Sequence, residues 1–211
     1  MAAGHSHSHG HDPSHSHAHS HSHDHGHGRG EGGKDHAMGG ATSRAPAAEH
    51  RARGPASVPC YALTVSDSRT AADDTGGRTI REVLEEQGHT VVGSAIVKDD
   101  ADAIRTAIQA ALARGARVVI TTGGTGLTSR DVTPEAIAPL VVRPIPGFGE
   151  LFRLLSWEQV GSAAMLSRAT AAVIQGNAVL FALPGSPAGV RLAMERLVAP
   201  ELPHLMEQLS R

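Results

Sequence analysis

The spacing of apolar and polar positions predicts a parallel α/β domain that begins near residue 58. Three apolar runs, Cys60–Ser66, Thr90–Val97 and Val118–Ile120, are typical of buried strands. The segments between them carry apolar residues at the three-to-four spacing of amphipathic helices. These helical positions are Ile80, Val83 and Leu84 in the first segment, and Ile104, Ala107, Ile108, Ala111 and Leu112 in the second. Strand and helix in this alternation indicate a parallel sheet with helices on both faces.

The second half continues with the same elements and one hairpin. A short helix is expected to bury Leu151, Phe152, Leu154 and Leu155. Two strands, Ala169–Ile174 and Ala178–Leu183, follow on either side of a Gly-Asn pair that is typical of a hairpin turn. Further helices are expected after Ser186 and around Leu205–Leu209.

Residues 1–57 differ in kind from the rest and are expected to form a disordered tail, which leaves 58–211 as the folded domain. The tail has scarcely an apolar side chain and cannot bury enough surface to offset its ordering entropy. Thirteen of the fifteen histidines lie in it. Alternating imidazoles on a flexible chain can converge on Ni²⁺ or Zn²⁺ ions, and a solvated tail with incidental metal affinity, or an affinity tag, is the alternative. The candidate ligands are His5, His7, His9, His15, His17, His19, His21, His23, His25 and His27.

The composition of the chain limits its cellular compartment and its classes of partner. The single cysteine, Cys60, cannot form an intramolecular disulfide, which fits a reducing compartment. No apolar run approaches membrane-spanning length, so we expect a cytoplasmic protein without a membrane partner. The net charge of −2 does not suggest a nucleic-acid partner.

The strand at Val118–Ile120 runs into a glycine-rich loop that is suited to an anion. Three of the four residues from Gly123 to Gly126 are glycines, which let a ligand approach the backbone closely. No Gly-Lys-Ser/Thr follows, so the loop is not a P-loop, and the third glycine of the dinucleotide fingerprint is missing. Thr133 is expected to cap the next helix, whose free amides would favour phosphate. A tight turn without a ligand is the alternative.

Carboxylates follow several predicted strands where each one ends. Asp67 follows the first strand, Asp99 the second and Asp131 the glycine loop. Ligands of parallel sheets bind beyond this edge, and carboxylates beside a phosphate loop would suit Mg²⁺. Asp67, Asp74 and Asp99 are equally suited to capping turns and helices. The turn Pro184-Gly185-Ser186 predicts either a second anion-binding edge or a plain helix cap.

Five blocks of this sequence together resemble the MoaB/Mog family of molybdenum cofactor biosynthesis proteins. The similarity covers roughly residues 60–200 and leaves the tail outside. The blocks are Thr121–Gly126, Arg130–Glu135, Ile145–Glu150, Leu166–Ala169 and Ala182–Ser186.

The resemblance implies a three-layer α/β/α fold with a mostly parallel central sheet, in trimers or multiples of them. It also implies binding of molybdopterin and, in active members, transfer of AMP from MgATP to the molybdopterin phosphate. The product goes to the molybdenum insertase. Asp99 and Asp131 match positions where active members place carboxylates for Mg²⁺ and the phosphates. The implied and inferred substrate-binding residues are Ser66, Asp67, Thr122, Gly123, Gly124, Thr125, Gly126, Ser167, Arg168, Pro184, Gly185 and Ser186.

Alternatives stay open at this point. Arg168 suits a phosphate by its bidentate geometry, but a structural ion pair is a rival role. A family fold does not guarantee turnover, so a non-catalytic molybdopterin-binding protein is possible. A metal-handling protein that works through the histidine tail is the third hypothesis.

Overall fold

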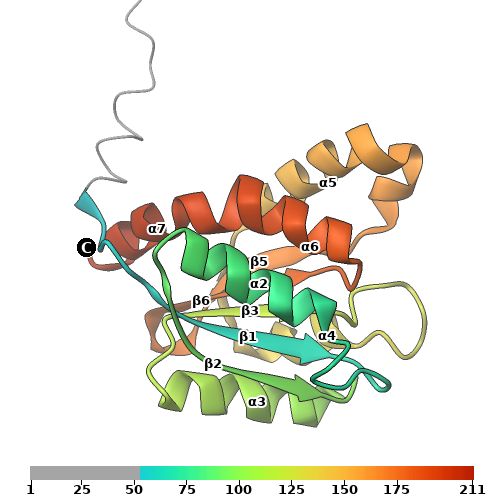
Figure 1. Cartoon of the computed structure of the whole chain (residues 1–211), viewed down its shortest axis with the longest axis horizontal. Helices are drawn as coiled ribbons and strands as arrows, with labels where there is room; N and C mark the ends of the chain where they lie inside the picture. The colour runs from blue at the N-terminus through green and yellow to red at the C-terminus, as the bar shows by residue number, and fades with distance from the viewer. Residues whose placement is uncertain (1–52) are drawn as a thin grey trace, which may run out of the picture. The chain divides into compact units, whose positions relative to one another are not determined.

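The computed structural model describes residues 53–211, which form a mixed six-stranded sheet between two layers of helices (Figure 1). The strands are β1 Pro59–Val65, β2 Thr90–Val97, β3 Val118–Thr122, β4 Val141–Pro144, β5 Thr170–Ile174 and β6 Ala178–Leu183. The helices are α2 Thr75–Glu86, α3 Ala101–Ala113, α4 Thr133–Ile137, α5 Pro146–Val160, α6 Pro187–Ala193 and α7 Leu202–Leu209. The shorter helical turns are η1 Ala138–Leu140, η2 Gly161–Leu166, η3 Gln175–Asn177, η4 Met194–Val198 and η5 Ala199–Glu201.

The strand order is β2-β1-β3-β6-β5-β4. The pairs β2–β1, β1–β3 and β3–β6 are parallel, and β5 runs antiparallel to both of its neighbours. This arrangement confirms the predicted α/β class and the mostly parallel sheet. The predicted hairpin is also present, because Gly176 and Asn177 both adopt the positive φ that a tight hairpin turn requires (75° and 57°).

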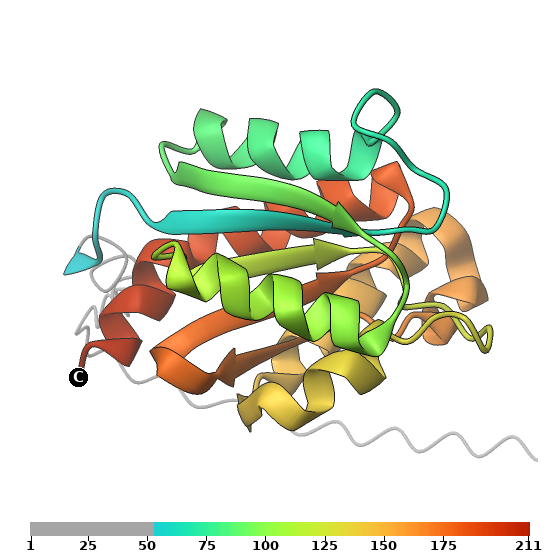
Figure 2. The same ribbon diagram turned by 90° about the horizontal axis from the view of Figure 1, so that it is seen from below.

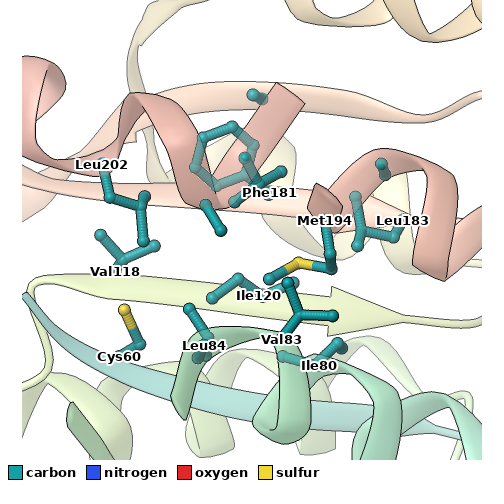
Figure 3. Packing of buried hydrophobic residues seen from close by; sticks show 14 of the residues in the cluster. Cys60, Ile80, Val83, Leu84, Val118, Ile120, Phe181, Leu183, Met194 and Leu202 are labelled. Carbon is teal, nitrogen blue, oxygen red and sulfur yellow. The ribbon is translucent and has the colours of Figure 1, made fainter. Parts of the chain in front are cut away.

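Alternate residues of each central strand enter different cores, since side chains on a strand point to opposite faces. On one face Ile120 packs with Ile80 and Leu84 of α2 and with Met194 (Figure 3). On the other face Leu63 and its neighbours pack against α3 and α4. Figure 2 shows α3 lying along the sheet on the side away from α2. The central sheet is therefore buried on both faces, as the continuous apolar runs predicted.

The helix α5 corrects one expectation from the sequence. It is longer than predicted, with fifteen residues, and it buries Phe148, Phe152 and Ser156, which follow one another at the four-residue helical spacing. Leu151 and Leu154 were expected in the core but lie on the other side of the helix and are exposed. The helix thus carries a second apolar stripe that no other part of residues 53–211 covers.

One further feature was not expected from the sequence. The short edge strand β4 ends in a proline, which a strand tolerates at a sheet edge because no neighbour needs the missing N–H. Within residues 53–211, no helix is long and apolar enough to cross a membrane.

Asp74 fixes the start of α2 against the sheet. Its carboxylate is buried, accepts from the backbone N–H of Gly77 at 2.9 Å, and accepts from the Thr64 hydroxyl of β1 at 3.0 Å. Asp74 therefore caps α2, which is one of the roles that the sequence suggested for it. One side chain joins a helix N-terminus to the central sheet.

We predict that Asp74→Ala lowers the free energy of unfolding by about 2 kcal/mol, because it removes an N-cap and leaves the buried Thr64 hydroxyl without its acceptor. Denaturant unfolding at fixed protein concentration measures the change. Asp102→Ala is the control, because Asp102 is an exposed carboxylate near the start of α3, and its loss should cost less than about 0.5 kcal/mol. Equal losses in the two variants would contradict the assignment.

Candidate active site at the carboxyl edge of the sheet

The loops that follow β1, β2, β3 and β6 meet at one edge, because these four strands are mutually parallel. The backbone N–H of Ser66 donates to the Val97 carbonyl at 2.8 Å, so the first two loops start side by side. Further along, the Asp67 carboxylate accepts from the backbone N–H of Asp99 at 3.3 Å. The Ser66 hydroxyl oxygen accepts from the backbone N–H of Ser68 and of Arg69 within its own turn.

Gly123 and Gly124 carry the chain past these loops in a conformation that only glycine adopts easily. Their φ angles are 101° and 64°. A Cβ on Gly123 would lie 2.2 Å from the Val65 carbonyl oxygen, and a Cβ on Gly124 would lie 2.7 Å from a carboxylate oxygen of Asp99. The backbone of the glycine loop therefore passes directly against Asp99. This close approach is the physical reason for two consecutive glycines here.

Two threonines, Thr122 and Thr125, hold the loop by donating to backbone carbonyls. Thr122 donates to the Pro184 carbonyl at 2.8 Å, and Thr125 donates to the Leu183 carbonyl at 3.5 Å. These two bonds tie the glycine loop to the turn after β6, where Gly185 also lies close to Gly123. Both hydroxyls predicted to bind substrate are thus used as donors to the protein itself.

Thr133 is not the helix cap that the sequence predicted. The N-cap of α4 is Val132, without a side-chain bond, and the buried Thr133 hydroxyl donates to the Gly123 carbonyl at 2.9 Å. A carbonyl turned inward by a positive-φ glycine offers this hydroxyl a buried acceptor. Because α4 has only five residues, we attribute the anion-binding potential of the loop to its own amides rather than to a helix dipole.

Asp99 and Asp131 lie on either side of the glycine loop in contrasting surroundings. Asp99 accepts from the Val132 N–H at 3.1 Å. Burial raises the pKa of its carboxyl group, and the negative charges of Asp131 and Asp67 raise it further. The hydroxyl and N–H of Thr128 bind the Asp131 carboxylate and lower its pKa. The two carboxylates are therefore close enough to influence each other, and their environments push their pKa values apart.

This pair fits Mg²⁺ by the chemistry of its donors. In residues 53–211 no group of three His, Cys, Asp or Glu side chains is arranged to hold a metal ion by itself. Mg²⁺ rarely needs such a cage, because it takes one or two carboxylates and completes its shell with water and substrate phosphates. Asp99 and Asp131 are the residues that could hold it here.

Arg168 lies at this edge but is engaged with the protein. Its Nε donates to the Gly126 carbonyl at 2.9 Å, one terminal nitrogen donates to the Asp131 carbonyl at 2.7 Å, and the other pairs with Glu135. Arg168 therefore forms a structural ion pair, which was the alternative to its binding a phosphate. Glu135 and Thr133 were not among the predicted site residues, although both lie within the Arg130–Glu135 block.

A cavity of about 150 Å³ opens beside the turn after β6. Ser167, Pro184 and Ser186 line it, as do residues of α5 and η2, among them Phe152 and Ala163, that were not among the predicted site residues. Ser186 also caps α6, since its hydroxyl accepts from the Gly189 N–H at 3.3 Å, so the cap alternative is present here too. The sequence signal for the other wall is limited to Ala163 and Ala164, within the run of small residues that forms η2.

The histidines predicted as Ni²⁺ or Zn²⁺ ligands, His5 to His27, lie outside the described residues. Their metal binding stays a prediction from the sequence.

Comparison with known proteins gives a consistent result. A sequence model described as a probable molybdopterin binding domain matches residues 61–204. Molybdenum cofactor biosynthesis protein B of Bacillus anthracis is 48% identical over 165 residues, covering 77% of this chain and 97% of the relative. The Bacillus subtilis protein of the same name is 46% identical over 165 residues, covering 77% and 96%.

Solved structures agree in fold. A crystal structure of a molybdenum cofactor biosynthesis protein B superposes with a TM-score of 0.71 at 47% identity, covering 74% of this chain and 98% of that one. The tungsten cofactor synthesizing protein MoaB from Pyrococcus furiosus gives a TM-score of 0.68 at 39% identity, covering 74% and 99%.

We predict that Asp131→Asn moves the pKa of Asp99 down toward its usual value, because one of the two neighbouring negative charges is removed while burial remains. Carbon-detected NMR titration of the carboxyl groups measures it. In the wild type Asp99 should titrate at higher pH than Asp131. Ionising Asp99 therefore opposes folding as the pH rises through its folded pKa, whereas the stabilisation from Asp131 is lost as the pH falls through its own.

Glu86→Gln, at the far end of α2, is the control for this titration and should leave Asp99 unchanged. An Asp99 pKa that does not respond to Asp131→Asn would show that the two carboxylates do not share one site.

Proposed function

Since the chain belongs to the molybdopterin-binding family of molybdenum cofactor biosynthesis proteins, we propose that it is a molybdopterin adenylyltransferase. A terminal phosphate oxygen of molybdopterin attacks the α-phosphorus of ATP. The bond from this phosphorus to the bridging oxygen breaks, and pyrophosphate leaves with the electron pair. The adenylylated product would pass to a molybdenum insertase, in the cytoplasm.

One observation carries the proposal. Asp99 and Asp131 flank a glycine loop whose backbone approaches the Thr133 hydroxyl and the Asp99 carboxylate so closely that Gly124 has no room for a side chain. A pterin-binding protein without turnover has no evident use for two mutually repelling carboxylates beside a phosphate-sized loop. A nucleotidyltransferase uses them, because its reaction needs positioning and charge neutralisation more than covalent help.

The roles divide between two neighbouring regions. Asp99 and Asp131 would hold Mg²⁺, which would supply charge neutralisation for the nucleotide phosphates. The amides of Gly124 and Thr125 would orient phosphate oxygens, whereas the Gly123 N–H donates to the Leu183 carbonyl at 3.2 Å and the Gly126 N–H bonds the Asp131 carboxylate. Asp67 supports the loop that carries Asp99 through its bond to the Asp99 N–H.

The cavity between α5, η2 and the turn after β6 is our candidate pocket for the pterin. Its lining combines apolar side chains, such as Phe152 and Val160, with the polar groups of Ser156, Gln159, Ser167 and Ser186. Pro184 and Gly185 connect this cavity to Gly123, so a molecule seated there could extend its phosphate toward the glycine loop.

The histidine tail is proposed as a separate metal-binding segment. The observation that favours this role is the concentration of thirteen histidines before residue 58. The candidate ions are Ni²⁺ and Zn²⁺, and the catalytic candidates all lie beyond the tail. Metal binding there would accompany the adenylyltransferase activity and does not replace it.

We predict that Asp99→Asn and Asp131→Asn each lower turnover by ~10²–10³-fold, the usual cost of one charge-stabilising group. Affinity for molybdopterin should survive, because the pterin cavity lies apart from both carboxylates. The double variant should lose less than the product of the two single losses, as residues that act through one ion do. Product formation and pterin binding are measured on all four proteins.

Near-normal turnover in either single variant would remove that carboxylate from the mechanism. Equal losses of pterin affinity and turnover would indicate instead that the aspartates merely order their loops. Pterin binding without any product in the wild type would favour the non-catalytic alternative.

Assembly into trimers is the second part of the proposal. The uncovered stripe of α5 and η2 includes Leu154, Trp157, Val160 and Met165, with Trp157 60% and Met165 75% exposed. Contiguous exposed apolar surface of this kind marks an interface. An apolar hollow of about 450 Å³ lies next to the stripe, between α5, η4 and α7, and shares Leu151 with it. In a closed trimer, one patch on each subunit contacts a different patch on its neighbour. The apolar stripe and the apolar hollow are two such patches.

We predict that the protein scatters light as a multiple of three chains at micromolar concentration, and that Trp157→Glu shifts it toward monomer, because a charge would be buried in the interface. Gln109→Glu on α3 adds the same charge on an exposed helix far from the stripe and should leave the mass unchanged. A wild-type monomer, or a Trp157→Glu trimer, would contradict this assignment.

A further inference from the structure

Arg168 directs all three of its side-chain nitrogens at one short stretch of chain. It follows η2 and precedes β5, so it comes from the antiparallel half of the sheet. Nε bonds to the carbonyl oxygen of Gly126 and one terminal nitrogen to that of Asp131, at 2.9 and 2.7 Å. The remaining nitrogen pairs with Glu135.

The two carbonyls stand on either side of the loop tip. Residues 127–130 between them are exposed, and within this tip the Thr128 hydroxyl and N–H bind the Asp131 carboxylate. One guanidinium therefore spans the base of the tip. It holds Asp131 by its backbone and leaves the carboxylate oxygens to other partners.

We propose that Arg168 is a positioning residue for the site, which fixes the segment Gly126–Asp131 so that the Asp131 carboxylate stays opposite Asp99. This assignment rests on the proposed adenylyl transfer for its effect on rate. It differs from a phosphate-binding role, because a guanidinium that took a phosphate oxygen would have to release carbonyls that it already holds. The planar guanidinium group suits this role because its N–H donors have a fixed separation, and so do the carbonyl oxygens of Gly126 and Asp131 that accept from them.

The ion pair with Glu135 contributes little to this arrangement. The Glu135 side chain is 59% exposed, and exposed ion pairs are screened by solvent. The carbonyl bonds carry the positioning, so a variant of Glu135 serves as a matched control.

The experiment compares Arg168→Lys, Arg168→Gln and Glu135→Gln with the wild type in two independent measurements. The first is the rate of trypsin cleavage after Arg130, which is exposed within the loop tip and reports release of the tip without any reference to activity. The second is kcat and KM for MgATP in the adenylylation assay. Far-UV circular dichroism and the thermal midpoint establish that each variant is folded.

We expect both Arg168 variants to speed cleavage after Arg130 by about tenfold or more, as local opening becomes easier. Turnover should fall by about 10²-fold, the scale of a catalytic group displaced by about an ångström, while KM for MgATP stays within about threefold. Arg168→Lys should change the cleavage rate and the turnover almost as much as Arg168→Gln does, because a single ammonium group cannot bond to both carbonyls. Glu135→Gln should resemble the wild type in both measurements.

Two results would overturn the assignment. Near-normal turnover in Arg168→Lys with a raised KM in Arg168→Gln would identify Arg168 as a phosphate ligand, since a lysine charge serves a phosphate well. Unchanged cleavage after Arg130 in both variants would show that the guanidinium does not hold the tip. If the wild type forms no adenylylated product, the proposed function fails, and the cleavage rates still decide whether Arg168 holds the loop.

Discussion

The site depends on a close approach between two segments of main chain that lie far apart in sequence. Gly123 passes so near the Val65 carbonyl, and Gly124 so near the Asp99 carboxylate, that any side chain at either position would overlap its neighbour. The positive φ angles turn the Gly123 carbonyl inward, where Thr133 donates to it. The bonds from Thr122 and Thr125 tie this part of the loop to the turn after β6.

The two halves of the sheet contribute different things to this site. The parallel half brings the ends of β1, β2 and β3 together and supplies both carboxylates. The antiparallel half supplies Arg168, just before β5, and with α5 and η2 forms one wall of the candidate pterin cavity. The site therefore lies beyond the carboxyl ends of the parallel strands β1, β2, β3 and β6, a position that matches the general rule for ligands in open α/β sheets.

Most of the fold could be predicted from the sequence because its signals are local. The strand runs, the helical spacing of Ile80, Val83 and Leu84, and the Gly-Asn turn each specify an element without reference to the rest of the chain. The errors in predicted burial arose at residues that could face either the core or the surface of the same helix. Leu151 and Leu154 are apolar and helical, but Phe148 and Phe152 occupy the core side of the same helix.

The candidate site could be predicted in outline and not in detail, for the same reason. Convergence of loops at the carboxyl edge follows from topology, so Asp67, Asp99 and the glycine loop could be brought together from sequence. The partners of individual side chains could not. Thr133 bonds to a carbonyl ten residues earlier instead of capping its helix, and Arg168 bonds to two carbonyls about forty residues away. Such contacts depend on the packed geometry rather than on spacing along the chain.

The most direct test of the account is the fate of the α-phosphorus of ATP. The purified protein is incubated with molybdopterin, Mg²⁺ and ATP labelled at the α-phosphate, and the products are separated and identified by mass. The account predicts that the label moves to molybdopterin as an adenylyl group, with one pyrophosphate released for each group transferred. Molybdopterin that binds while all of the label stays in ATP would contradict it.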